Sequence, residues 1–247
     1  DLYDQYPVAK ALIEQADKAL GESLSAVMFE GPGEELTRTC NCQPALYVHG
    51  LACLAVLKEL VPSLNPVAAA GLSLGEFTAH AAAGTYSFEE GLRLVQKRGA
   101  FMEEACNATK GTMAAMIGGT DENVIKLAQE CDVDVANFNC PGQTVVSGTE
   151  EGVAKAVAGA KAAGCKIAKK LNVAGAYHSR LMHSAMVKLA EELKNISFGT
   201  PSMPVYCNYE ARVVEGPDDI RSMLEHQVCG SVRWTASMQK LVDQGHR

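Results

Sequence analysis

This sequence lacks a basic charge excess, a Cys-X-X-Cys pair and any apolar run long enough to cross a membrane. Its 22 Lys and Arg are outnumbered by 29 Asp and Glu, and with a single Trp it has no global signature of nucleic-acid binding. A membrane span needs roughly 20 apolar residues in succession, and the longest small-residue stretches, 67–70 and 79–84, are much shorter. We therefore expect a folded protein that binds neither nucleic acid nor a membrane.

The cysteine content argues against a disulfide framework and against a zinc site. Nine Cys are present, an odd number without metal-ligand spacing, and Cys40 and Cys42 are too close in sequence for an ordinary bridge. Free thiols in a reducing compartment fit this pattern better than a disulfide framework or a zinc site. The cytoplasm of a bacterium and the stroma of a plastid or mitochondrion both qualify. We expect no metal site and no tightly bound cofactor.

Length and composition allow one large domain with a smaller insertion, since 47% of the 247 residues are hydrophobic. Apolar spacing predicts helices at 7–20 and 43–60, the second with Pro44 in its first turn. Ser87 and Glu90 form a capping-box pattern that starts a helix running to about Cys106. An apolar run at 67–71 predicts a short buried strand, and a further helix is predicted at 178–196.

Residues 111–173 alternate between short strands and helices. The predicted order is strand 112–117, helix 122–130, strands 133–137 and 143–147, helix 151–163 and strand 166–171. This β-α-β-β-α-β order is that of a ferredoxin-like unit. We predict an α/β protein in which residues 1–110 and 174–247 form a large domain and residues 111–173 an inserted small domain. The alternative is that these strands continue a single sheet.

The sharpest local motif is a G-x-S-x-G sequence, Gly71-Leu72-Ser73-Leu74-Gly75, placed between an apolar strand and a predicted helix at 76–83. A tight strand-to-helix turn strains the backbone at the serine and exposes its hydroxyl at the helix N-terminus. The N–H of Leu74 would then point to where an oxyanion forms. The context favours a nucleophilic Ser73 over a simple glycine-rich turn.

A serine hydroxyl needs a base, and the chain has six His. His178 follows a small-residue loop and opens the predicted helix 178–196, so its ring could reach Ser73, with His183 in reserve one turn later. His80 lies two turns along the helix that follows Ser73, too far to reach it. The remaining three are expected to be packing or surface residues: His49, His226 and His246. No Asp or Glu stands out as the third member that would orient the imidazole, but a carbonyl can accept the same hydrogen bond.

Several blocks together resemble malonyl-CoA:acyl carrier protein transacylases, over essentially the whole chain and in the expected order. They are Gly71-Leu72-Ser73-Leu74-Gly75-Glu76, Arg98-Gly99, Asn137-Phe138-Asn139-Cys140-Pro141-Gly142-Gln143, Tyr177-His178-Ser179-Arg180-Leu181-Met182 and Gln227 with Val232-Arg233-Trp234. The resemblance implies a hydrolase-like α/β large domain with an inserted ferredoxin-like small domain, and an active site in the cleft between them.

The resemblance also implies a role for each site residue. Ser73 would be acylated, His178 would be its base, and Leu74 would supply an oxyanion N–H. Arg98 would bind the free carboxylate of the malonyl group, although spacing alone favours a helix-surface Arg. The Gln227 carbonyl would orient the imidazole. Pocket volume near Met102 and Tyr177 would decide whether larger dicarboxylic acyl groups enter.

Two departures from the family pattern affect these expectations. The family usually has His where Leu72 stands, a position beside the elbow where Leu is tolerable. The family's N-terminal strand, with its Gly-Gln-Gly loop and second oxyanion donor, has no match here, and neither has its C-terminal Gly-Pro-Gly segment. We expect a polypeptide trimmed at both ends, with weak activity or none.

A carrier protein is acidic, so docking to this acidic chain would need a local positive face. Residues 151–180 hold an excess of five positive charges, to which Lys161, Lys166, Lys169, Lys170 and Arg180 contribute. We predict carrier docking across this edge of the small domain, where electrostatics would mainly set the encounter rate. The alternative is a solvated face that keeps the domain soluble.

Two other functions remain open from the sequence. A serine esterase or thioesterase of the α/β-hydrolase kind shares the G-x-S-x-G elbow, but it needs an acid between Ser73 and His178, where the inserted domain is predicted. A non-catalytic carrier-binding module is the third possibility, and the presence of Ser73, Arg98 and His178 argues against it.

Overall fold

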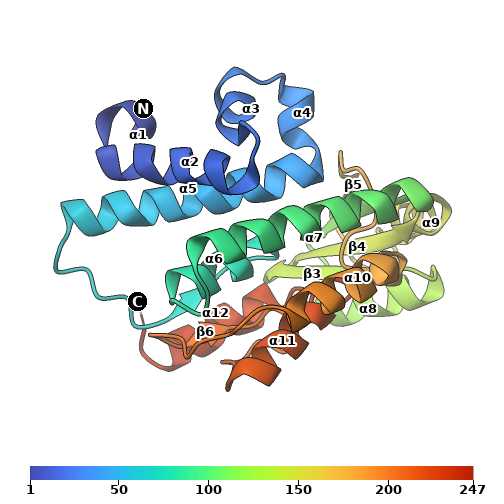
Figure 1. Cartoon of the computed structure of the whole chain (residues 1–247). Helices are drawn as coiled ribbons and strands as arrows, with labels where there is room; N and C mark the ends of the chain where they lie inside the picture. The colour runs from blue at the N-terminus through green and yellow to red at the C-terminus, as the bar shows by residue number, and fades with distance from the viewer. Residues whose placement is uncertain (247) are drawn as a thin grey trace.

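The computed structural model describes residues 1–246, a largely helical assembly with two separate sheets (Figure 1). The helices before the serine motif are α1 (Leu2–Gln5), α2 (Pro7–Leu20), α3 (Leu24–Glu30), α4 (Gly33–Thr37) and α5 (Thr39–Leu60). Those that follow it in the same part of the molecule are α6 (Leu74–Ala82), α7 (Phe88–Ala108), the 3-10 helix η1 (Arg180–Met182), α10 (His183–Lys194), α11 (Pro217–His226) and α12 (Trp234–Asp243).

Helix α5 runs beside α2 and α7 and contributes its buried face to the main core (Figure 1). It begins at Thr39, so the prediction that Pro44 lies in its first turn was wrong: Pro44 lies one turn further in. The N-cap, Arg38, makes no side-chain capping bond, which left this start without a sequence signal. By length and composition alone, the helix is also long and apolar enough to cross a membrane. Here it packs against α2, α6 and α7.

Helix α7 carries the predicted capping box. The Ser87 hydroxyl accepts from the backbone of Glu90, whose carboxylate accepts from the backbone of Ser87. In the middle of the helix, a Cβ on Gly99 would lie 2.5 Å from the carbonyl oxygen of Thr39. Only glycine permits this close approach of α7 to the start of α5, and it brings Arg98 next to the residues of α5.

A four-stranded antiparallel sheet forms the other part of the molecule, in the spatial order β3-β4-β2-β5. Its elements are β2 (Gly111–Ile117), α8 (Asp121–Glu130), β3 (Asp134–Cys140), β4 (Gln143–Thr149), α9 (Glu150–Gly159) and β5 (Ile167–Lys170). Helices α8 and α9 cover one face around Val124, Val146 and Val153. The predicted order is present, although α9 stops at Gly159 rather than at 163, and residues 160–164 form turns that end at Gly164, with φ 82°. We retain 111–173 as the proposed small domain.

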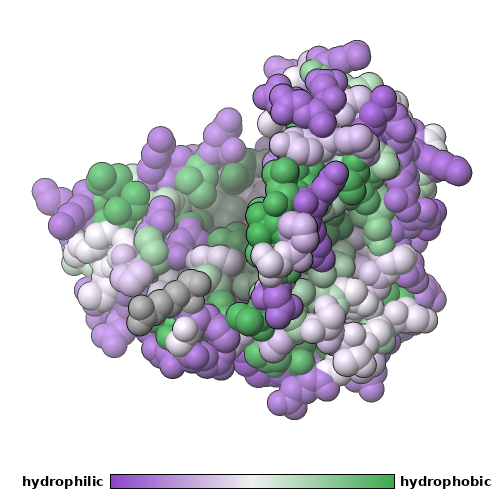
Figure 2. Space-filling view, turned by 90° about the vertical axis from the view of Figure 1, so that its left-hand side faces the viewer, coloured by the Kyte–Doolittle hydropathy of each residue, from purple (hydrophilic) through white to green (hydrophobic). Residues whose placement is uncertain are grey.

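The sheet that carries the serine motif is shorter than predicted. The expected strand at 67–71 is reduced to β1 (Ala69–Ala70), which pairs in parallel with β6 (Val205–Tyr206). Beside β1, an apolar groove of about 470 Å³ extends between α5 and α6, and Leu72 lines it. Figure 2 shows a hollow with apolar side chains along its wall on this side of the molecule.

The prediction of one helix over 178–196 was wrong at its start. His178 has φ 55°, outside the helical region, and α10 begins only at His183. The intervening turn is held by Ser179, whose hydroxyl donates to the Ala176 carbonyl at 2.6 Å and accepts from the backbone of Leu181. This turn, rather than a helix N-terminus, presents the His178 ring.

The basic segment carries less free charge than the sequence count indicates. Lys170 pairs with Glu150 at 3.5 Å, and Arg180 pairs with Asp132 and Asp134. Lys169 lies opposite Ala115 on the neighbouring strand, so it emerges on the face away from α8 and α9. The count overlooked Asp132 and Asp134 because they lie outside the counted window in sequence but next to Arg180 in space.

Loss of the capping box should destabilise the helix that carries Arg98. We expect Ser87→Ala to lower the free energy of unfolding by about 1 kcal/mol, since the backbone donor at Glu90 loses its partner. Urea denaturation followed by circular dichroism measures the change. The exposed Ser63, in the loop after α5, gives the control Ser63→Ala, and equal effects of the two substitutions would contradict the cap's contribution.

Candidate active site

Ser73 lies in the turn between β1 and α6, in a backbone conformation that L-residues rarely adopt. Its φ is 53° and its ψ is −106°. The turn is so tight that a Cβ on Gly71 would lie 1.9 Å from the carbonyl oxygen of Gly75. Helix α6 then begins at Leu74, whose N–H is therefore among the free donors of the helix N-terminus. This is the geometry of a nucleophile elbow.

The structure brings Ser73 and His178 together. The Ser73 Oγ lies 2.7 Å from Nε2 of His178, and Nδ1 of the same ring lies 2.9 Å from the backbone carbonyl oxygen of Gln227. A carbonyl can only accept, so Nδ1 carries the proton and Nε2 is free to accept one from the hydroxyl. The arrangement can therefore deprotonate Ser73 without a carboxylate behind the imidazole.

Burial keeps the His178 imidazole neutral. The residue is only 4% exposed, and burial followed by the nearby charge of Arg98 lowers the pKa of His178 to about 4. Hydrogen bonding to the backbone opposes this shift but does not overcome it. At neutral pH the ring is thus in the unprotonated form that a general base requires.

Arg98 is buried at the same point, contrary to its spacing-based interpretation as a surface residue. Only 1% of it is exposed. Its Nη1 donates to Oε1 of Gln43 at 2.6 Å, and its Nη2 donates to Oε1 of Gln227 at 2.9 Å and to Oγ of Ser73 at 3.1 Å. Burial lowers the pKa of Arg98 to about 10, which still leaves the guanidinium charged at neutral pH. A permanent cation thus touches the nucleophile.

Three neighbours of this group carried no assigned role in the sequence analysis: Gln43, Glu76 and Asn208. Glu76 is fully buried, and its Oε2 accepts from Nε2 of Gln227 at 2.6 Å. Asn208 follows β6 and bonds to the elbow. Glu76 stands in the serine motif and could have been noticed, whereas nothing local distinguishes Gln43 or Asn208.

The remaining predicted pocket residues lie around the guanidinium. Met102, 3% exposed and one turn after Arg98, accepts from Nε2 of Gln43 through its sulfur at 3.4 Å. Tyr177 precedes His178 and packs against both the main core and the face of the four-stranded sheet opposite α8 and α9. Leu72, the departure from the family pattern, is 41% exposed in the apolar groove.

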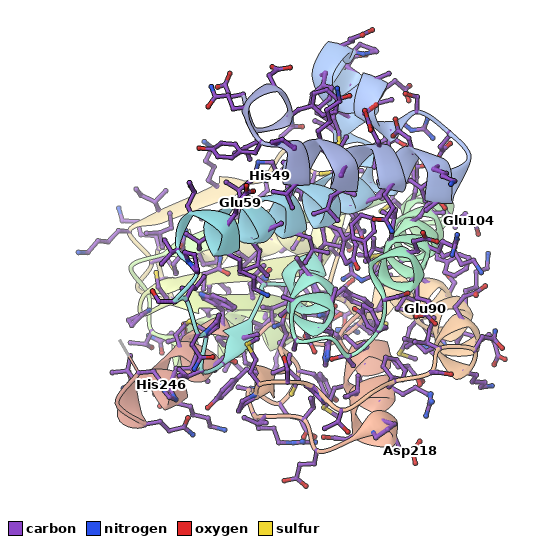
Figure 3. The ribbon with its side chains drawn as sticks, turned by 60° about the vertical axis from the view of Figure 1, so that its left-hand side comes forward. His49, Glu59, Glu90, Glu104, Asp218 and His246 are labelled. Atoms are coloured by element: carbon purple, nitrogen blue, oxygen red, sulfur yellow. The ribbon has the colours of Figure 1, made fainter. Side chains whose placement is uncertain are left out.

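The other histidines lie elsewhere. His80 is buried beside Thr85 at 3.2 Å, and burial lowers its pKa to about 4. His226 stacks on Tyr209, and His183 is exposed at the start of α10. His49 is exposed on α5, and Figure 3 shows it far from His246. Within residues 1–246, no group of three or more His, Cys, Asp or Glu could hold a metal ion.

The pH dependence of Ser73 reactivity should reflect the lowered pKa of His178. Because the folded ring stays neutral as pH falls, labelling of Ser73 by a fluorophosphonate should persist below pH 6.5, the ordinary value, and halve near pH 4. The labelling rate measured across this range by mass spectrometry tests it. A half-rate at pH 6.5 would contradict the assignment.

Two variants test which charged groups set the pH dependence of Ser73 labelling. Arg98→Met removes a positive neighbour, so the half-rate pH should rise. Burial raises the pKa of Glu76 to about 7, and any inflection there should vanish in Glu76→Gln.

Comparisons with known proteins show which family the chain belongs to. The model of the acyl transferase domain family matches residues 1–247. Malonyl CoA-acyl carrier protein transacylases of Bacillus subtilis and Escherichia coli K12 are 42% and 39% identical, over 99% of this chain and 78% and 80% of their own lengths.

Solved structures agree as well. The Coxiella burnetii malonyl CoA-acyl carrier protein transacylase has a TM-score of 0.96 at 35% identity, covering 100% of this chain and 79% of its own. A malonyl-transacylase in complex with its type II PKS acyl-carrier protein has a TM-score of 0.95 at 36% identity, covering 100% of this chain and 81% of its own. These matches confirm the family resemblance and the α/β fold class, and the chain belongs to the acyl transferase domain family.

Proposed function

We propose that this protein transfers a malonyl group from malonyl-CoA to the phosphopantetheine thiol of an acyl carrier protein, through a malonyl-serine intermediate, in fatty acid biosynthesis. The observation that carries the proposal is the contact between the buried Arg98 guanidinium and Ser73 Oγ at 3.1 Å. A buried cation beside a nucleophile suits an acyl group that ends in a carboxylate. The names of the relatives support the same substrate pair.

In the first half-reaction, Ser73 Oγ attacks the thioester carbonyl of malonyl-CoA while Nε2 of His178 takes its proton. The Leu74 N–H, aided by the α6 dipole, stabilises the oxyanion. The C–S bond then breaks, the CoA sulfur receives the proton from His178, and Ser73 carries the malonyl ester. In the second half-reaction the carrier thiol gives its proton to His178 and attacks that ester, and Ser73 recovers its proton.

During both steps, Arg98 would hold the free malonyl carboxylate in a bidentate pair. Its Nη1 and Nη2 now bond to neutral amide oxygens of Gln43 and Gln227. A carboxylate forms stronger, charge-assisted bonds than these amides. Met102 lies beside this position and would bound the acyl pocket.

The two alternative functions are less well supported. A hydrolase of neutral esters has no use for a buried guanidinium beside its nucleophile, whereas an acyl group that ends in a carboxylate pairs with it. A non-catalytic module needs no 2.7 Å contact between a serine and a neutral imidazole. The transferase reaction uses all of these features without a metal or a tightly bound cofactor.

The carrier is expected to dock at the β5 edge of the small sheet, where Lys169 is exposed. Lys169 emerges there, on the face that also packs Tyr177 next to His178. Lys161 and Lys166 are exposed in the turn before β5. Arg180 and Lys170 are already ion-paired and contribute less. The complex described for one structural relative supports a carrier as partner, and the bacterial relatives support a cytoplasmic location.

Incubation of the 247-residue chain with malonyl-CoA should produce one malonyl adduct on Ser73, detected by intact mass and absent in Ser73→Ala. In Arg98→Ala, malonyl transfer should fall about 100-fold while acetyl transfer is unchanged or improved, because a lost charged hydrogen bond costs up to about 3 kcal/mol. Arg93→Ala, on the exposed face of the same helix, is the matched control.

Each outcome of this experiment decides between functions. Rapid CoA release without an adduct would indicate a hydrolase, and no reaction would remove the catalytic proposal. An unchanged malonyl preference in Arg98→Ala would remove the role of Arg98.

Charge reversal should separate the two faces of β5. We expect Lys169→Glu to raise the apparent KM for the carrier, with a strong salt dependence, and to leave the KM for malonyl-CoA unchanged. Lys170→Glu, on the face of the helices, is the control and should have the smaller effect. Steady-state kinetics at two salt concentrations measure both. Equal effects of the two variants, or equal effects on both substrates, would rule out docking beside Lys169.

A further inference from the structure

The conformation of Ser73 needs support from outside the elbow. A non-glycine residue at φ 53° is strained and persists only where its surroundings hold it. The first turn of α6 provides part of this support through its own backbone bonds. The remaining polar groups of the elbow, the Ser73 N–H and the carbonyl oxygens of Gly71 and Ser73, bond to side chains from distant segments.

Asn208 supplies two of these bonds with one side chain. Its Oδ1 accepts from the Ser73 N–H at 2.6 Å, and its Nδ2 donates to the Gly71 carbonyl at 2.7 Å. Asn208 is 1% exposed and follows β6, which pairs with the strand leading into the elbow. The side chain therefore bridges the two ends of the turn.

Glu76 links this bridge to Gln227. Its Oε2 accepts from the Asn208 N–H at 2.9 Å and from Nε2 of Gln227 at 2.6 Å. Nε2 of Gln227 also donates to the Ser73 carbonyl at 2.9 Å. All three side chains are fully or almost fully buried, so water does not replace these bonds.

The link determines which way the Gln227 amide faces. Oε2 of Glu76 already accepts from the Asn208 N–H, so any proton on this carboxyl lies on Oε1 and Oε2 remains an acceptor. A guanidinium only donates. With Nε2 toward Glu76, the Gln227 oxygen must face Arg98, as it does at 2.9 Å. The reverse orientation would place oxygen against oxygen at Glu76 and donor against donor at Arg98. The same residue's backbone carbonyl orients His178.

We propose that Asn208 and Glu76 are positioning residues of the acyl-transfer site: Asn208 holds the Ser73 backbone in its strained turn, and Glu76 holds Asn208 and the Gln227 amide that aims Arg98. The proposal rests on the proposed function for its substrate, but the hold on Ser73 is independent of which acyl group is transferred. Both residues act through others and touch no substrate.

The two carboxylate oxygens of Glu76 differ in their hydrogen bonds, and this difference provides a test of the proposed role of Glu76. Oε2 accepts both bonds, whereas Oε1 is buried without a partner. An amide with its oxygen at the Oε2 position retains both bonds. Glu76→Gln should therefore keep the malonyl-over-acetyl ratio within about threefold of the unaltered chain, and Glu76→Met should lower this ratio at least tenfold. A Glu76→Gln variant as impaired as Glu76→Met would overturn the hydrogen-bonding role and leave charge as the cause.

The hold on Ser73 is tested without malonyl-CoA. Asn208→Ala should slow fluorophosphonate labelling of Ser73 at least tenfold at a temperature where circular dichroism shows the chain folded. Asn195→Ala removes an exposed amide that caps the end of α10 and is the matched control, with no change expected. Equal labelling of Asn208→Ala and the unaltered chain would refute the proposal.

Failure of the proposed function and failure of the positioning role would give different results. If the unaltered chain labels with fluorophosphonate but forms no malonyl adduct, the proposed function fails, while the Asn208→Ala comparison still decides the positioning role. If Glu76→Met does not fold, Glu76→Gln and Asn208→Ala retain their stated outcomes.

Discussion

The burial of one positive charge governs the arrangement of this site. Arg98 is removed from water, and within residues 1–246 no carboxylate lies close enough to form an ion pair with it. Neutral amide oxygens and the Ser73 hydroxyl satisfy its two terminal nitrogens, while Nε has no partner. The protein thus keeps the guanidinium in place without neutralising it. An anionic substrate group would supply the negative charge that no carboxylate of the described residues provides.

Arg98 and Ser73 are held together by side chains from segments that are distant in the sequence. Close packing at Gly99 brings α5, with Gln43, against α7. The parallel pairing of β1 with β6 brings residue 208 to the elbow. Gln227, just after α11, then bonds to Ser73, Arg98 and His178 at once. If any one of these segments were removed, polar groups of the others would lose their hydrogen-bond partners.

The sequence was informative where structure depends on local chemistry. The elbow at Ser73, the cap at Ser87 and the order of strands and helices along 111–173 follow from neighbouring residues and were predicted. The predicted start of α5 was wrong because Arg38 gives no capping signal. Asn208 was missed because its function is a contact between residues 135 positions apart, and His178 was misplaced in a helix because its φ is imposed by the Ser179 turn.

The carbonyl behind His178 has a consequence for the direction of the reaction. Gln227 orients the imidazole without placing an anion behind it, so the protonated ring gains less stabilisation than it would from an aspartate. Such a ring passes its proton on readily, to the departing CoA sulfur in the first half-reaction and to Ser73 in the second. Thioester is exchanged for thioester here, with little net driving force, so the same proton transfers run in the forward and in the reverse exchange.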